Sequence, residues 1–105
     1  MPIEVTPAEA RALVTESSGI IVDVREKWEL EVCSIVGARH IPLQDVPRNL
    51  DQVPTDRPVI INCHHGMRSM QAVRWLRDQG YDNVTNLQGG IDLWSQEIDG
   101  SIARY

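Results

Sequence analysis

The residues best placed to do chemistry lie in one short segment, residues 62–69 (NCHHGMRS). This segment follows a β-branched run, 58–62, and leads into a stretch with helical spacing of apolar residues, 67–79. A thiol between a strand end and a helix N-terminus, close to a guanidinium, is stabilised as a thiolate and can attack an electrophile. A lone cysteine in an apolar strand is usually a small core residue, but the polar and cationic residues after Cys63 are poor core material. We therefore predict that Cys63 is a reactive nucleophile.

Two histidines directly after the cysteine allow a metal-ligand interpretation. Adjacent side chains of a strand-like segment point in opposite directions, and no cluster of further ligands is evident in the sequence. We therefore expect no metal site, and we interpret His64 and His65 as polar walls of the loop rather than as general bases.

The elements that must position Cys63 alternate along the chain. Strands alternating with helices predict βα units and a mostly parallel sheet with helices on both faces. The ligand site of such a sheet lies at the carboxyl ends of the strands, which is where Cys63 lies. The expected strands are 3–5, 20–24, 39–41, 58–62 and 84–87. Four helices are expected: one that Thr6 caps and that ends at 17–19, a short one at 26–31, one at 67–79 and one that begins at 89–90. Within 45–53 we expect at most a 3₁₀ turn.

Length and composition limit the class of protein. The chain has 105 residues, the length of one domain, so we expect residues 1–105 to form a single domain. Fifteen acidic and ten basic residues give a net charge of −5, which disfavours a nucleic-acid partner. Apolar runs are too short for a membrane-spanning helix, and no signal peptide opens the chain. The expected location is the cytoplasm, where the thiols of Cys33 and Cys63 stay free.

Four segments, in order, resemble the signatures of the single-domain rhodanese (thiosulfate sulfurtransferase-like) family. They are Asp23 to Glu26, Gly37 to Leu43, the loop from Cys63 to Ser69, and the stretch from Gly80 to Trp94. The resemblance implies a rhodanese-like three-layer α/β domain, in which a mostly parallel central sheet is flanked by helices on both faces.

The same resemblance implies a sulfurtransferase of the thiosulfate:cyanide type that acts in sulfur metabolism without a cofactor. Cys63 would take a sulfane sulfur from a small anionic donor, thiosulfate or a persulfide, and become a persulfide. The sulfur would then pass to a thiophilic acceptor, which is cyanide, a thiol or a protein. Backbone amides of 64–69 would cradle the persulfide, Arg68 would bind the anionic donor, and Ser69 would hydrogen-bond the loop. The implied substrate-binding residues are His64, His65, Gly66, Met67, Arg68 and Ser69.

Several positions keep two interpretations. The family often has Gly-His-Ile where this chain has Cys33-Ser34-Ile35; we expect Cys33 to be structural, with a resolving thiol as the alternative. Asp23 and Arg25 are expected to form a structural ion pair, although they could instead contact the active-site loop. The three tryptophans are expected to be packing residues rather than a surface for ligand stacking; they are Trp28, Trp75 and Trp94.

Two rival functions remain. Cysteine phosphatases and arsenate reductases with this fold have Cys-x5-Arg, whereas the span from Cys63 to Arg68 is Cys-x4-Arg and suits a sulfur atom better than a tetrahedral oxyanion. A regulatory module with a dead site is disfavoured because the cysteine and the arginine are both present. A persulfide relay to a partner protein stays open, since its chemistry at Cys63 would be the same.

Overall fold

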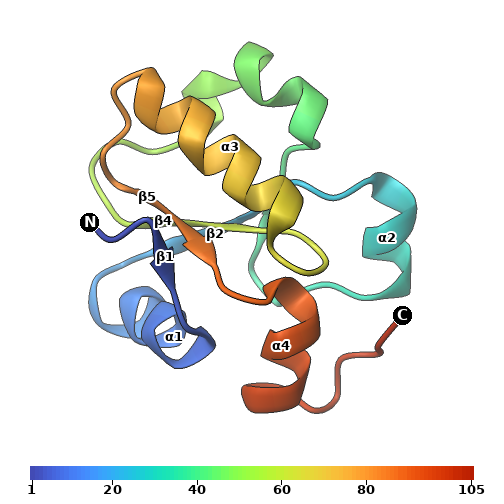
Figure 1. Ribbon diagram of the computed structural model, residues 1–105. Coiled ribbons are helices and arrows are strands. Elements are labelled where there is room, and N and C mark those ends of the chain that lie inside the picture. The colour runs from blue at the N-terminus through green and yellow to red at the C-terminus, as the bar shows by residue number, and fades with distance from the viewer.

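Five strands form one sheet in the order β1-β5-β4-β2-β3, and every neighbouring pair is parallel (Figure 1). The computed structural model describes all 105 residues. The alternation of strands and helices along the chain therefore predicts the sheet correctly, and the strands are parallel throughout.

The observed elements agree with the expected ones to within about two residues at their ends, where helices and strands commonly fray. The segment around 45–53 is 3₁₀, as its prolines require, and it forms two short helices. The strands are β1 (Glu4–Val5), β2 (Ile20–Asp23), β3 (Arg39–His40), β4 (Val59–Asn62) and β5 (Val84–Leu87). The helices are α1 (Pro7–Glu16), α2 (Lys27–Val32), α3 (Met67–Asp78) and α4 (Gly90–Glu97), and the 3₁₀ helices are η1 (Leu43–Arg48) and η2 (Leu50–Gln52).

The sheet separates two apolar cores, which makes the domain three layers deep. On one face, α3 and the 3₁₀ segment pack on the sheet; on the other face, α1 and α4 do so (Figure 1). β4 supplies side chains to both cores because successive strand residues point to opposite faces: Ile60 packs with α1 and α4, whereas Val59, Ile61 and Cys63 pack with α3. The central strand is consequently buried on both sides, as its continuous apolar run predicts.

Local capping sets where the first helix begins. The Thr6 hydroxyl accepts the backbone N–H of Glu9, and the Glu9 carboxylate accepts the backbone N–H of Thr6, so the predicted capping box is present. None of the helices combines the length and apolar character that a membrane span requires.

The prediction that all three tryptophans are packing residues is wrong for Trp28. Trp94 is buried in the core and Trp75 packs against the edge of the other core. The Trp28 side chain on α2 is 59% exposed, and its only aromatic neighbour is Tyr105, at 6.1 Å between ring centroids. No other layer of the fold packs over the face of α2 that carries Trp28, so the indole stays at the surface.

Candidate active site

The Cys63 thiol lies at the carboxyl end of β4, where the chain turns through a short loop into α3. The residue is only 1% exposed. Gly66 makes the turn with φ +104°, a left-handed conformation that disfavours any side chain. Its backbone N–H donates to Cys63 Sγ at 3.0 Å, and the Ser69 hydroxyl lies 3.2 Å from the same sulfur. The loop thus curls around the sulfur and presents donors to it.

The N-terminus of α4 is hydrogen-bonded to the start of this loop. The backbone N–H groups of Ile91 and Asp92 donate to the carbonyls of Cys63 and His64, at 2.9 and 3.1 Å. Gly90 permits this approach, because a Cβ there would lie 2.5 Å from both carbonyl oxygens. Two first-turn donors of α4 are therefore satisfied by the loop, and the loop backbone is anchored at the sulfur.

Ser69 connects the sulfur to β5. Its hydroxyl lies within hydrogen-bond distance of both Cys63 Sγ and Asn86 Oδ1. The Asn86 amide group donates to the Glu4 carboxylate at 2.9 Å and to the Gly66 carbonyl at 3.1 Å, so its oxygen must face Ser69. A hydroxyl has one proton. Ser69 can therefore accept from the thiol while donating to Asn86, and can turn its proton to the sulfur once Cys63 is a thiolate.

Arg68 is the cation closest in sequence to the thiol, and it is not free. Its guanidinium donates two hydrogen bonds to the Glu29 carboxylate, at 2.7 and 2.8 Å. Hydrogen bonding from Arg68 lowers the pKa of Glu29 to about 2, so the carboxylate is ionised at neutral pH. The Glu29 side chain is 4% exposed and that of Arg68 is 37% exposed, which leaves the outer guanidinium hydrogens open to an incoming anion.

Tyr105 completes this network, although nothing in the sequence points to it. Its hydroxyl donates to Glu29 at 2.8 Å and accepts from the Arg25 guanidinium at 2.9 Å. Its ring stacks on His64, with 3.8 Å between centroids and 4° between planes. Burial raises the pKa of Tyr105 to about 12, so the hydroxyl keeps its proton at neutral pH. No local pattern could have revealed this residue, because its partners lie 76 and 80 positions earlier in the chain.

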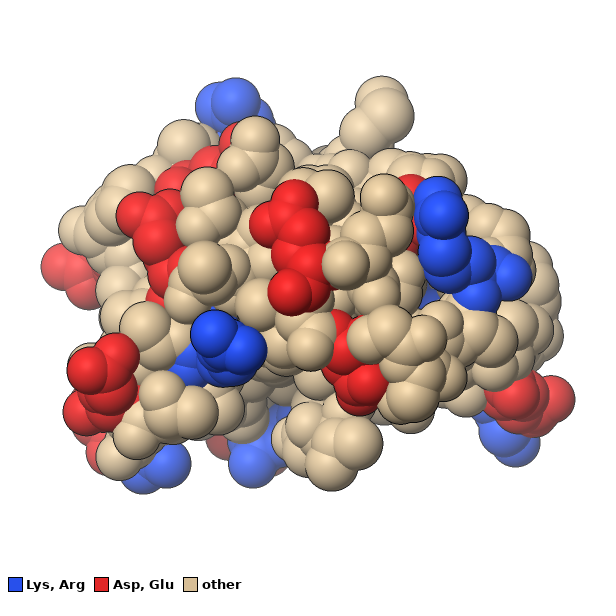
Figure 2. Space-filling view, turned by 90° about the horizontal axis from the view of Figure 1, so that it is seen from below, with Lys and Arg blue, Asp and Glu red and all other residues tan.

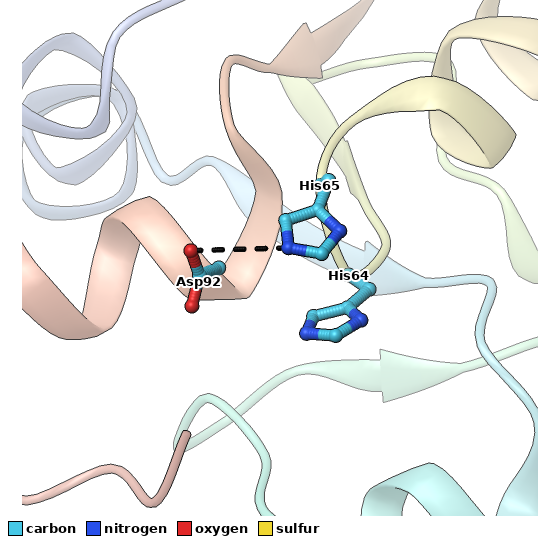
Figure 3. A group of neighbouring side chains, drawn as sticks. All are labelled: His64, His65 and Asp92. Carbon is cyan, nitrogen blue, oxygen red and sulfur yellow. Dashed lines mark ion pairs between the residues drawn. The ribbon is translucent and has the colours of Figure 1, made fainter. Parts of the chain in front are cut away.

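The two loop histidines do not point in opposite directions, so that prediction is wrong. Their rings stack at 3.8 Å between centroids, because the chain turns here instead of continuing as a strand. Asp92 lies beside them, 3.9 Å from His65 Nε2 (Figure 3). Burial, and then the neighbouring His65, lower the pKa of His64, so it is neutral near pH 7.

His64, His65 and Asp92 form a three-residue group whose ligand atoms lie within 4.8 Å of one another. Stacked imidazole rings direct their in-plane lone pairs side by side, whereas a zinc site needs lone pairs that converge on one point. The Asp92 carboxylate is also engaged, since Arg104 donates to it at 2.9 Å. The arrangement favours a polar wall of the loop over a metal centre.

Asp23 and Arg25 form a fully buried ion pair, 2.7 Å between Nη2 and Oδ2. Asp23 also accepts from the Asn62 amide at 3.1 Å, which ties the ends of β2 and β4 together. The structural interpretation of this pair is therefore correct. Cys33 lies on the Arg25 side: its carbonyl accepts from the guanidinium at 2.9 Å. Cys33 packs on the α1–α4 core and Cys63 in the α3 core, so the two thiols belong to opposite faces of the sheet.

Charged side chains are interspersed over the face seen in Figure 2, where isolated Lys and Arg residues lie among Asp and Glu and form no broad basic patch. The molecule as a whole is acidic, with a net charge of −5. Phosphate-backbone binding relies on clustered cations, so neither the net charge nor the face in Figure 2 indicates a nucleic-acid partner.

Comparisons with known proteins identify the family of this chain. The Rhodanese-like domain family matches residues 6–97. A protein named thiosulfate sulfurtransferase GlpE from Actinobacillus succinogenes is 32% identical over 93 residues, covering 89% of this chain and 84% of that protein. A protein named sulfurtransferase from Allochromatium vinosum is 39% identical over 77 residues, covering 73% of this chain and 72% of that protein.

A solved structure gives the same result for the fold. The rhodanese-related protein from Thermoplasma volcanium superposes with a TM-score of 0.83 at 28% identity, over 92% of this chain and 94% of that one. The family match and the superposed structure each cover nearly the whole chain, and the protein belongs to the rhodanese-like domain family.

Proposed function

We propose that this protein is a sulfurtransferase that carries sulfane sulfur on Cys63 as a persulfide. The coarse activity rests on the family match and on relatives named sulfurtransferases. The observation that carries the assignment to Cys63 is the loop geometry, in which the Gly66 N–H and the Ser69 hydroxyl both reach Sγ. Donors aimed at Cys63 Sγ stabilise the negative charge of the thiolate that attacks the sulfur donor.

The proposed reaction has two steps. The Cys63 thiolate attacks the outer sulfur of thiosulfate, a Cys–S bond to that sulfur forms, the S–S bond of thiosulfate breaks, and sulfite leaves with the electron pair. A nucleophile such as cyanide or a thiolate then attacks the terminal sulfur, and the Cys63 thiolate is released. In this proposal the outer hydrogens of the Arg68 guanidinium bind the sulfonate oxygens of the donor, while Glu29 accepts the inner ones.

The loop also supports sulfur transfer over phosphoryl transfer. From Cys63 to Arg68 only four residues intervene, and two of the Arg68 hydrogens are committed to Glu29. A phosphatase would need a wider loop whose amides and arginine surround a tetrahedral dianion. We therefore expect no turnover of small aryl phosphates.

Intact mass after donor treatment tests the proposal. Thiosulfate should add about 32 Da, the mass of one sulfur atom, and cyanide should remove it. Cys63→Ser should abolish both the adduct and thiocyanate formation, whereas the matched variant Cys33→Ser should keep most of the activity. Equal loss in the two variants would refute the single-cysteine mechanism, and an adduct that cyanide cannot remove would refute the transfer step.

A further inference from the structure

Residues 99–105 follow α4 as an irregular segment, here called the strap, that returns toward the catalytic loop. Figure 1 shows the chain passing from α4 to an end beside α2. Along the way, Ile102 packs against the α1–α4 core, and the Arg104 guanidinium pairs with Asp92 at 2.9 Å. The strap therefore has a defined course, although it belongs to no helix or strand.

The strap ends in the contacts of Tyr105. The ring lies flat on His64, the residue directly after the nucleophile, and the hydroxyl reaches Glu29 on α2. Glu29 in turn holds Arg68 at the far end of the loop. Tyr105 thus bridges the loop that begins at Cys63 and the helix α2.

We propose that Tyr105 is a specificity-determining residue that closes the entrance to Cys63 and limits the size of the molecules that reach its thiol. Cys63 is 1% exposed, so some neighbouring group must move before any reagent can contact the sulfur. The loop backbone is anchored by α4 and by the sheet, as described above, and Asp23 and Arg25 are fully buried. Tyr105 covers the side chain of His64, the residue next to Cys63, and it belongs to a segment without regular structure.

The strength of those contacts indicates how the closure works. Hydrogen bonds to charged groups are stronger than neutral ones, and the Tyr105 hydroxyl makes two of them, to Glu29 and Arg25. The ion pair of Arg104 with Asp92 is solvent-exposed on the arginine side and adds little. The closed position is therefore favoured but reversible, and small reagents need only a partial opening.

Alkylation of the thiol tests this inference independently of sulfur transfer. In a Cys33→Ser background, the rate of Cys63 alkylation would be measured with iodoacetamide and with a bulky fluorescein maleimide. Loss of one hydrogen bond to a charged group changes an equilibrium by about tenfold. We expect Tyr105→Ala to raise the maleimide-to-iodoacetamide rate ratio by about tenfold or more. Tyr105→Phe, which keeps the ring and loses both hydroxyl contacts, should raise it by a smaller factor.

Two matched variants serve as controls. Tyr81→Phe removes a partly buried hydroxyl that lies next to the Leu50 carbonyl. Ile3→Ala shortens a side chain as exposed as that of Tyr105, in the residue just before β1. Neither substitution should change the ratio. An unchanged ratio in both Tyr105 variants would overturn the inference. An equal acceleration with the two reagents would also overturn it, because that result indicates general loosening and not a size-selective entrance.

Discussion

Replacing Glu29 with Gln is the most informative test of how the site is held together. The Glu29 carboxylate accepts two hydrogen bonds from Arg68 and one from Tyr105, and it accepts the backbone N–H of Glu26 at the start of α2. Glutamine has the same shape, but its NH₂ group would replace one of two oxygens that each accept two hydrogen bonds, so it would face two donors. The substitution therefore removes the charge while leaving the packing nearly unchanged.

The size of the effect follows from the pKa of Glu29. A fall from the ordinary 4.5 to about 2 corresponds to roughly 3 kcal/mol of stabilisation, at about 1.4 kcal/mol per pKa unit. Water screens the exposed side of Arg68, so this figure is an upper bound. We expect Glu29→Gln to lower the free energy of unfolding by about 2 kcal/mol near pH 7, which corresponds to a Tm lower by roughly 8–15 °C.

The same pKa predicts the pH dependence of this difference. The folded pKa of Glu29 lies below the unfolded one, so its stabilisation is fully present above pH 4.5 and is lost as the pH falls toward about 2. The free-energy gap between wild type and Glu29→Gln should therefore be largest at neutral pH and should shrink steadily below pH 4.5.

Urea unfolding of both proteins near pH 7 and at about pH 3.5 measures the gap. Glu31→Gln is the matched control, because Glu31 is an exposed residue of the same helix; it should change stability by no more than about 0.5 kcal/mol. A gap that stays constant between the two pH values would refute the ion-pair argument, and so would an equal loss in the control.

Three further variants test the neighbourhood of the sulfur. Ser69→Ala leaves the buried Asn86 oxygen without its donor and should cost about 1–3 kcal/mol in urea unfolding; it should also lower kcat for thiocyanate formation, and unchanged kinetics would argue against its contact with Cys63. Gly90→Ala adds a Cβ 2.5 Å from two loop carbonyls at φ +59° and should reduce activity at least tenfold by displacing the loop; wild-type kinetics would show that the loop tolerates the shift. One residue inserted between Gly66 and Arg68 should lower sulfur transfer, which the same thiocyanate assay measures, and a fully active insertion variant would remove the argument from loop length.

The amino-acid sequence by itself determined the elements and the place of Cys63, the proposed nucleophile. Continuous β-branched runs predict the buried strands β2 and β4, and the capping box predicts the start of α1, because these signals act over a few neighbouring residues. The position of Cys63 at a strand end is equally local. Parallel strands place their carboxyl ends along one edge, so the general location of the site also follows from the order of elements.

The tertiary structure alone decided which side chains meet around the sulfur. Glu29 and Arg68 are 39 positions apart, and Tyr105 is 76 positions from Glu29. No period or motif links such pairs, since their contact depends on how α2 and the strap pack at the end of the sheet. The stacking of His64 on His65 has a similar origin: the turn around Gly66 overrides the alternation that an extended segment would have. The sequence thus indicated Cys63 as the proposed nucleophile, whereas the packing of distant segments determined which side chains surround its loop.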